Sequence, residues 1–226
     1  YFAMTQGTVP DLIHMVDNGI GGRYTFEYAN SSSFDNTGGD GISDLSMNYK
    51  VCTKLTISDG IGHDVSTTYD YKNGFAFSAY INNKKETDFF GFSNFTITDP
   101  QGSKNEILYH TSAYANYLFN RALSGALYQT RFTGYDSKEY SKILTSYSVH
   151  EIHPAYGFAA VSYLVYPNQI RKYVTGVLAE TKNSSLEIST AEYRLLSKTE
   201  SVTDHYSDAA HPVQTVSNFT QFEYIA

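Results

Sequence analysis

The sequence predicts an all-β fold in which many short antiparallel strands and hairpins form a curved sheet. Of the 226 residues, 21 are Tyr, 14 are Phe and none is Trp; Tyr and Phe, like Thr and Val, favour strands. Turn signals recur about every 8–12 residues between stretches of alternating polarity, which is typical of an all-β assembly. No charge run or linker marks an interior boundary, so we expect residues 1–226 to form a single β-rich segment of a longer polypeptide.

A turn–strand unit recurs three times in the first half of the chain. Each copy reads Asp or Asn, Gly or Pro, any residue, Gly, six residues and Tyr, and the copies begin 41 (18 to 59) and 40 (59 to 99) residues apart. A period in this range indicates a repeat architecture. Because glycine accepts positive φ and Asp bonds its own backbone, a turn that feeds a half-buried strand is favoured over a ligand loop. The structural residues of the unit are Asn18, Gly21 and Tyr28, then Asp59, Gly62, Tyr69, Asp70 and Tyr71, and finally Asp99, Gly102 and Tyr109.

The individual elements follow from the same patterns. Residues 11–28 are expected to form a strand, a turn and a strand, and residues 30–44 a polar, glycine-rich loop. Further strands are expected at about 48–58, 63–71, 74–81, 86–98 and 104–110, and then at about 126–133, 141–152, 157–166, 171–181, 186–196, 198–206 and 213–225. Between the two groups, Tyr114, Tyr117, Leu118 and Arg121 have helical spacing and Gly125 follows them. We therefore expect at most one short helix, near residues 113–124.

The loop at residues 30–44 contains the one candidate metal site. Asn36, Asp40, Gly41 and Asp44 occupy positions 1, 5, 6 and 9 of a calcium-binding loop, whose hard cation prefers such oxygen ligands beside a glycine turn. Position 3 is Gly38, so one ligand is missing. We expect a surface loop that holds no tightly bound calcium, with Asn36, Asp40 and Asp44 as the weak candidate ligands.

The sequence shows no other group of residues with a recognisable chemistry. The seven histidines are scattered along the chain, whereas a zinc site needs three or four converging ligands. No G-x-S-x-G elbow, P-loop or H-E-x-x-H motif occurs. We therefore expect no catalytic residues, no cofactor and no enzymatic activity.

Charge and hydropathy limit the partners. The net charge is −7, and a nucleic-acid partner would require a basic stripe that the sequence lacks. No apolar run approaches the ~20 residues of a membrane-spanning helix. Cys52 is the only cysteine, so no internal disulfide can form.

Several ordered motifs resemble a known family. The turn unit with its Tyr69-Asp70 pair resembles the YD repeats of RHS proteins, and the flanking residues resemble the region after the β-propeller in toxin-complex (Tc) B subunits. The matching positions are Asp11, Leu12, Asp17, Asn18, Gly19, Gly21, Tyr28 and Ser31, then Tyr69, Tyr71, Gly74, Asp88, Phe89, Gly91 and Phe92, and later Leu123, Ser124, Gly125, Gly134 and Asp136. The resemblance is best over 11–110 and looser over 111–226. No Asp follows Tyr109 and no Arg follows Gly102, which suits a peripheral segment rather than the central repeats.

The resemblance implies a structural role. It suggests a wall segment of an RHS/YD-type β-sheet shell in a secreted or cell-surface bacterial virulence protein. The implied partners are neighbouring segments of the same polypeptide, an enclosed C-terminal toxin and other toxin-complex subunits. Composition alone equally permits an extracellular, aromatic-rich β module that binds a glycan or host surface, because tyrosine faces suit sugar stacking as well as sheet packing. A free-standing hydrolase is the third and least supported alternative, since no catalytic constellation is present.

Overall fold

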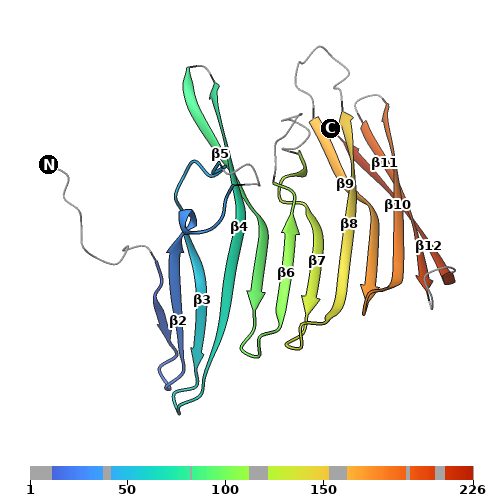
Figure 1. The fold of residues 1–226 in the computed structure, drawn as a ribbon. Helices are drawn as coiled ribbons and strands as arrows, with labels where there is room; N and C mark the ends of the chain where they lie inside the picture. The colour runs from blue at the N-terminus through green and yellow to red at the C-terminus, as the bar shows by residue number, and fades with distance from the viewer. Residues whose placement is uncertain are drawn as a thin grey trace.

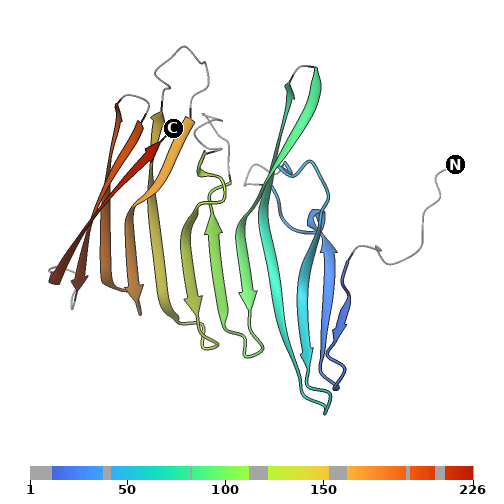
Figure 2. The same cartoon turned by 180° about the vertical axis from the view of Figure 1, so that it is seen from behind.

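The computed structural model describes residues 12–37, 42–81, 83–111, 122–152, 162–191, 194–206 and 212–225. Twelve strands form one sheet whose spatial order follows the chain from β1 to β12. Every neighbouring pair is antiparallel. The sheet is open, because β1 and β12 are its two edges, and it is curved (Figures 1 and 2). The predicted all-β, antiparallel, curved-sheet fold is confirmed.

The strands differ widely in length, and the longest lie in the middle and the second half of the sheet. They are β1 Met15–Asp17, β2 Arg23–Asn30, β3 Lys50–Ser58, β4 Asp64–Ile81, β5 Lys84–Thr98, β6 Lys104–Tyr109, β7 Leu127–Thr133, β8 Glu139–Ile152, β9 Ser162–Val174, β10 Val177–Ala191, β11 Arg194–Tyr206 and β12 Pro212–Ile225. A 3-10 turn, Ser31–Ser33, follows β2.

Consecutive antiparallel strands place successive connections alternately at the two ends of the sheet. The turns at 18–22, 59–63, 99–103, 134–138 and 175–176 therefore share one end, which we call the turn rim. It is the lower end of the sheet in Figure 1. The long connections, at residues 31–49 and 110–126 among others, lie at the opposite end, the loop rim. The three copies of the repeated turn are thus brought to the same rim.

The strand register defines two chemically different faces from β2 to β8, since residues paired across strands lie on the same side. One side, the aromatic face, carries mainly apolar residues: Tyr24, Phe26, Leu55, Ile57, Val65, Tyr69, Tyr71, Phe95, Ile97, Ile107, Phe132 and Ile143. The other, the polar face, carries mainly Thr25, Glu27, Lys54, Thr56, Ser66, Thr68, Asp70, Thr96, Thr98, Lys104, Glu106, Arg131 and Lys142. The alternation expected of half-buried strands is therefore maintained across the sheet.

The two faces are stabilised differently. On the polar face, Lys54 pairs with Glu27 at 3.0 Å and Arg131 pairs with Glu106 on the neighbouring strand. On the aromatic face, no hydrophobic side chain among the described residues is fully buried, and Ile57, Val65 and Phe132 remain exposed. Neighbouring strands thus pair through their backbones, while the described residues provide no layer that fully buries a side chain of the aromatic face.

Some predicted boundaries are wrong. Residues 63–71 and 74–81, expected as two strands, form the single strand β4, because β5 pairs with it on both sides of Asn73 and Gly74. The strand expected at 171–181 is divided by a two-residue turn at Thr175 and Gly176, both at positive φ, which joins β9 to β10. The boundary between the strands expected at about 186–196 and 198–206 also lies earlier in the chain than predicted, because β10 ends at Ala191 and β11 begins at Arg194.

The predicted helix falls mainly outside the described residues. Residues 112–121 are not described, residues 122–123 are helical and a turn follows them. Gly125 has a φ of +79° and its N–H donates to the carbonyl of His110 at 2.9 Å. The glycine therefore ends this connection in the left-handed conformation that favours it.

Candidate functional site

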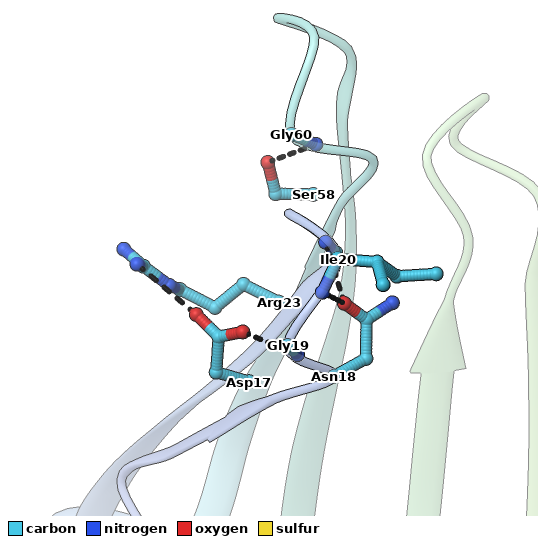
Figure 3. Close-up of polar contacts among 8 residues, drawn as sticks. Asp17, Asn18, Gly19, Ile20, Arg23, Ser58 and Gly60 are labelled. Atoms are coloured by element: carbon cyan, nitrogen blue, oxygen red, sulfur yellow. Dashed lines mark hydrogen bonds and ion pairs between the residues drawn. The ribbon is translucent and has the colours of Figure 1, made fainter.

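The three copies of the repeated turn have the same local structure. In each, the first side chain accepts two backbone N–H bonds, from the residues two and four positions later. The distances are 3.0 and 2.8 Å at Asn18, 2.9 and 3.1 Å at Asp59, and 2.9 and 2.8 Å at Asp99. Figure 3 shows the first copy, in which the Asn18 side-chain oxygen lies within the turn. Asp and Asn are the residues best able to cap their own turn in this way.

The backbone completes the same geometry in each copy. The N–H of the first residue donates to the carbonyl four positions later, at 3.0, 3.3 and 2.9 Å. The fourth residue, Gly21, Gly62 or Gly102, has a φ of +101°, +104° or +90°. Glycine is strongly favoured there because side-chain-bearing residues seldom adopt this conformation. The turn is thus a rigid, self-capped connector rather than an open loop.

A fourth copy, which sequence reasoning missed, lies between β7 and β8. Gly134 N–H donates to Lys138 O at 2.9 Å, and Ser137 occupies the position with positive φ, at +63°. Here the carboxylate comes from the third residue, Asp136, whose Oδ1 accepts the Lys138 N–H at 3.2 Å. The template does not match this turn because the acid is the third residue instead of the first, and the residue with positive φ is Ser137 instead of a glycine. The Gly134–Asp136 pair was the available signal.

Two turns of the rim pack directly against each other. Gly60 has a φ of +80°, and a Cβ placed on it would lie 2.9 Å from Gly21 Cα and would clash with the Gly21 carbonyl. Beside this contact, Asp17 pairs with Arg23 at 3.4 Å (Figure 3), and Asp59 Oδ2 lies 2.8 Å from His63 Nδ1. Hydrogen bonds from the N–H groups of Ile61 and His63 lower the pKa of the Asp59 carboxyl.

The tyrosines that end each repeat differ in their contacts. The Tyr28 hydroxyl donates to Ile13 O at 2.9 Å. Tyr69 stacks on Phe95 of β5 with ring centroids 5.9 Å apart, whereas Tyr109 ends β6 half-buried. The Tyr71 hydroxyl donates to a backbone carbonyl of β3 at 2.8 Å.

Asn36 anchors the long β2–β3 connection on β4. It is 3% exposed, and its Nδ2 donates to the carbonyls of Ser31 and Phe34, both at 2.9 Å. Its Oδ1 accepts the N–H of Gly74 at 2.8 Å. The neighbouring amide of Asn73, at a φ of +52°, donates to Asp35 O at 2.7 Å. The connection therefore takes up β4 hydrogen bonds beyond the point where β3 stops pairing with that strand.

An aromatic cluster surrounds this anchor and contains several motif residues of the family resemblance. The Tyr71 ring lies 5.0 Å from that of Phe92 and 5.5 Å from that of Phe34. The Phe92 ring covers Gly74, where a Cβ would lie 2.9 Å from the ring edge. Burial raises the pKa of Tyr71 to about 12, so its hydroxyl stays neutral and remains a donor. The motif positions Tyr71, Gly74 and Phe92 thus contribute packing and loop attachment.

The calcium candidate is divided between described and undescribed residues. Asp40 lies outside the described residues, and the Asn36 side chain is already engaged with three backbone groups. The Asp44 N–H donates to Asn36 O at 2.8 Å. In the part of the chain that the structure describes, no group of three or more His, Cys, Asp or Glu side chains could hold a metal ion.

The described histidines on the later strands have aromatic or acidic neighbours. The half-buried His110 ring lies 4.9 Å from Tyr128 and 5.9 Å from Tyr147, and burial lowers the pKa of His110. His205 lies 3.7 Å from Glu180 on the adjacent strand.

Among the described residues, no helix has the length and hydropathy needed to cross a membrane.

The fold and the capped turns define an open, amphipathic β-sheet built from repeated hairpins. Comparison with protein families identifies its kind: residues 2–121, just over half of the chain, match the family described as the middle/N-terminal region of the insecticide toxin TcdB. The chain belongs to this toxin-complex family, as the sequence motifs indicated. No curated protein and no solved structure matches the chain.

Proposed function

We propose that the chain is a non-catalytic wall segment of an RHS/Tc-type β-shell that encloses a toxin. The observation that supports this proposal most strongly is the open twelve-stranded sheet, whose described residues include no buried hydrophobic side chain. A free-standing globular domain needs a second layer to bury its apolar side. A wall segment obtains that cover from other parts of its assembly.

The energetics favour a covered aromatic face. Full burial of a large apolar side chain stabilises a protein by about 1.5–3 kcal/mol. Ile57, Val65, Phe132 and Ile143 are exposed on this face, so a covering layer would add several kcal/mol. The opposite face already carries cross-strand ion pairs and hydroxyl pairs, such as Thr56 with Ser66 at 2.9 Å, and is suited to water.

The topology is also suited to a wall. A meander in sequence order grows in one direction, and each of its tight turns occupies only a few residues, so the sheet can extend without crossing connections. In this proposal the neighbours are other segments of the same polypeptide, and the enclosed partner is a C-terminal toxin of a secreted bacterial protein. The capped turns and the Asn36 anchor serve to hold the sheet rigid.

Limited proteolysis of the parent polypeptide tests this role. Gly60→Val and Gly102→Val break two capped turns, because both glycines have positive φ. We expect the C-terminal region to become cleavable in the double variant. Gln101→Ala, at an exposed position in the same turn as Gly102, should leave that region protected. Equal protection in all variants, or turnover of a substrate by the chain itself, would refute the proposal.

A glycan-binding module is the second candidate, and the exposed rings favour it. Tyr24 and Phe132 present partly exposed aromatic surface on the same face, and sugars stack on such rings. A glycan array separates the two functions. Binding that Tyr24→Ala abolishes would support the module, whereas a shell segment should give no signal.

A further inference from the structure

The most exposed large apolar side chains lie on the turn rim. Among the described residues, Ile20 is 89% exposed, Ile61 81% and Tyr135 78%, and all three belong to capped turns of that rim. Isolated exposed hydrophobic residues are ordinary. Their concentration at the tips of hairpins on one rim is what needs an explanation.

The turn itself does not require isoleucine at these positions. Ile20 and Ile61 are the third residues of their turns, and each contributes only its backbone N–H to the capping side chain. The third turn has Gln101 at the equivalent position and makes the same hydrogen bond at 2.9 Å. A polar residue therefore folds equally well there, and the two isoleucines are available for another purpose.

The two isoleucines are held as a pair. They belong to neighbouring turns whose backbones touch at Gly21 and Gly60, each one residue from an isoleucine. Because consecutive Cα atoms are only 3.8 Å apart, a single partner surface can contact both side chains. The self-capped turns fix their backbones, so little conformational freedom would be lost on binding.

Charge distinguishes between the possible partners of this pair. The two turns and their flanks carry Asp17, Asp59 and Asp64 against Arg23, a net charge of −2 with His63 neutral (three negative, one positive). Backbone hydrogen bonds are the main cause that lowers the pKa values of the Asp17 and Asp59 carboxyl groups, so both groups stay ionised at neutral pH. Such a surface repels an anionic lipid leaflet and attracts a surface that bears Lys or Arg.

We propose that Ile20 and Ile61 form a docking pair that inserts into an apolar recess, bordered by Lys or Arg, on a separate protein subunit of the toxin complex. A separate subunit is favoured because the same polypeptide extends the sheet through its edges and covers it through its faces. The turn rim serves neither purpose. This inference rests on the proposed shell role for the identity of the assembly.

Site-specific photocrosslinking tests the contact in the full-length parent polypeptide assembled with its toxin-complex subunits. Benzoylphenylalanine replaces Ile61 in one protein and Gln101 in a matched control, and crosslinked peptides are identified by mass spectrometry. We expect position 61 to crosslink to a peptide of another subunit that contains apolar and basic residues, and position 101 not to do so. A crosslink within the same polypeptide, between two copies of it, or equally from both positions would overturn the proposal.

An affinity measurement provides the second test. Binding of the full-length polypeptide to the crosslinked subunit should weaken about tenfold for Ile20→Gln or Ile61→Gln. The affinity should weaken further when the salt concentration is raised. Gln101→Asn, the matched control, should leave the affinity unchanged. Undiminished binding of the double variant, or greater binding of the protein to phosphatidylglycerol vesicles than to that subunit, would overturn the proposal. These substitutions leave the turns capped, so protection of the enclosed region, which tests the shell role, should not change.

Discussion

Removing the Asn36 side chain should detach the β2–β3 connection from β4. The Asn36→Ala variant loses two donated hydrogen bonds and the bond accepted from Gly74 N–H, in a site where Asn36 is 3% exposed. At about 0.5–1.5 kcal/mol for each net hydrogen bond, the loss of the three bonds is about 1.5–4.5 kcal/mol. The loss is local, because the anchor holds one connection rather than the whole sheet.

Hydrogen exchange measures this loss directly. In the peptide that covers residues 71–76, the amides of Asn73 and Gly74 donate to the connection, and their exchange should accelerate about tenfold or more in Asn36→Ala. Asn105→Ala, at an exposed position of β6, is the matched control and should leave these amides unchanged. Asn36→Asp should keep the acceptor for Gly74 but place a carboxylate against two carbonyl oxygens. Unchanged exchange in Asn36→Ala would refute the anchoring role.

Three further predictions concern the turns and the aromatic cluster. Gly60→Ala should destabilise the chain more than Gly62→Ala in urea denaturation, since both have positive φ but only the first would clash with the neighbouring turn; equal losses would contradict the packed rim. The lowered pKa of Asp59 means that its stabilising effect is present above the ordinary value of 3.8 and is lost as the pH falls below it. Asp59→Asn, which keeps the accepting oxygen, should remove that acid sensitivity in NMR spectra of the turn amides. The pKa of Tyr71, raised to about 12, predicts that its stabilising effect is present below pH 10 and lost as the pH rises toward 12. Tyr71→Phe should remove one tyrosine that ionises near pH 12 from an alkaline absorbance titration.

The sequence predicted the features that depend on local chemistry. An Asp or Asn that caps its own turn, followed by a glycine at positive φ, is encoded within five residues, and so the turns at 18–22, 59–63 and 99–103 could be placed before the fold was known. The alternation of side chains along each strand equally predicted two different faces. The turn at 134–138 was missed because Gly134 and Ser137 exchange the usual residue types while the backbone geometry is retained.

The features that the sequence did not predict depend on distant residues. Asn36 and Gly74 are 38 positions apart, and the glycine-rich composition of the connection suggested an exposed loop rather than an anchored one. A neighbouring hydrogen bond, from Asn73 N–H to Asp35 O, explains why β4 continues through Asn73, whose left-handed backbone usually ends a strand. The incomplete burial of the aromatic face among the described residues could not be predicted either, because an amphipathic strand pattern shows that a face is apolar but not what covers it.

The structure has three kinds of boundary, and each suits a different kind of contact. The edges at β1 and β12 offer backbone donors and acceptors, which suit pairing with another strand. The aromatic face offers apolar area with little directionality, so any well-packed layer can cover it. The turn rim offers a few exposed side chains on self-capped turn backbones, which suits a specific contact more than an extended one. Covering the aromatic face would therefore add most to the stability of the sheet. The third residue of a rim turn, by contrast, can vary from Ile20 and Ile61 to Gln101 without affecting the hydrogen bond that caps the turn.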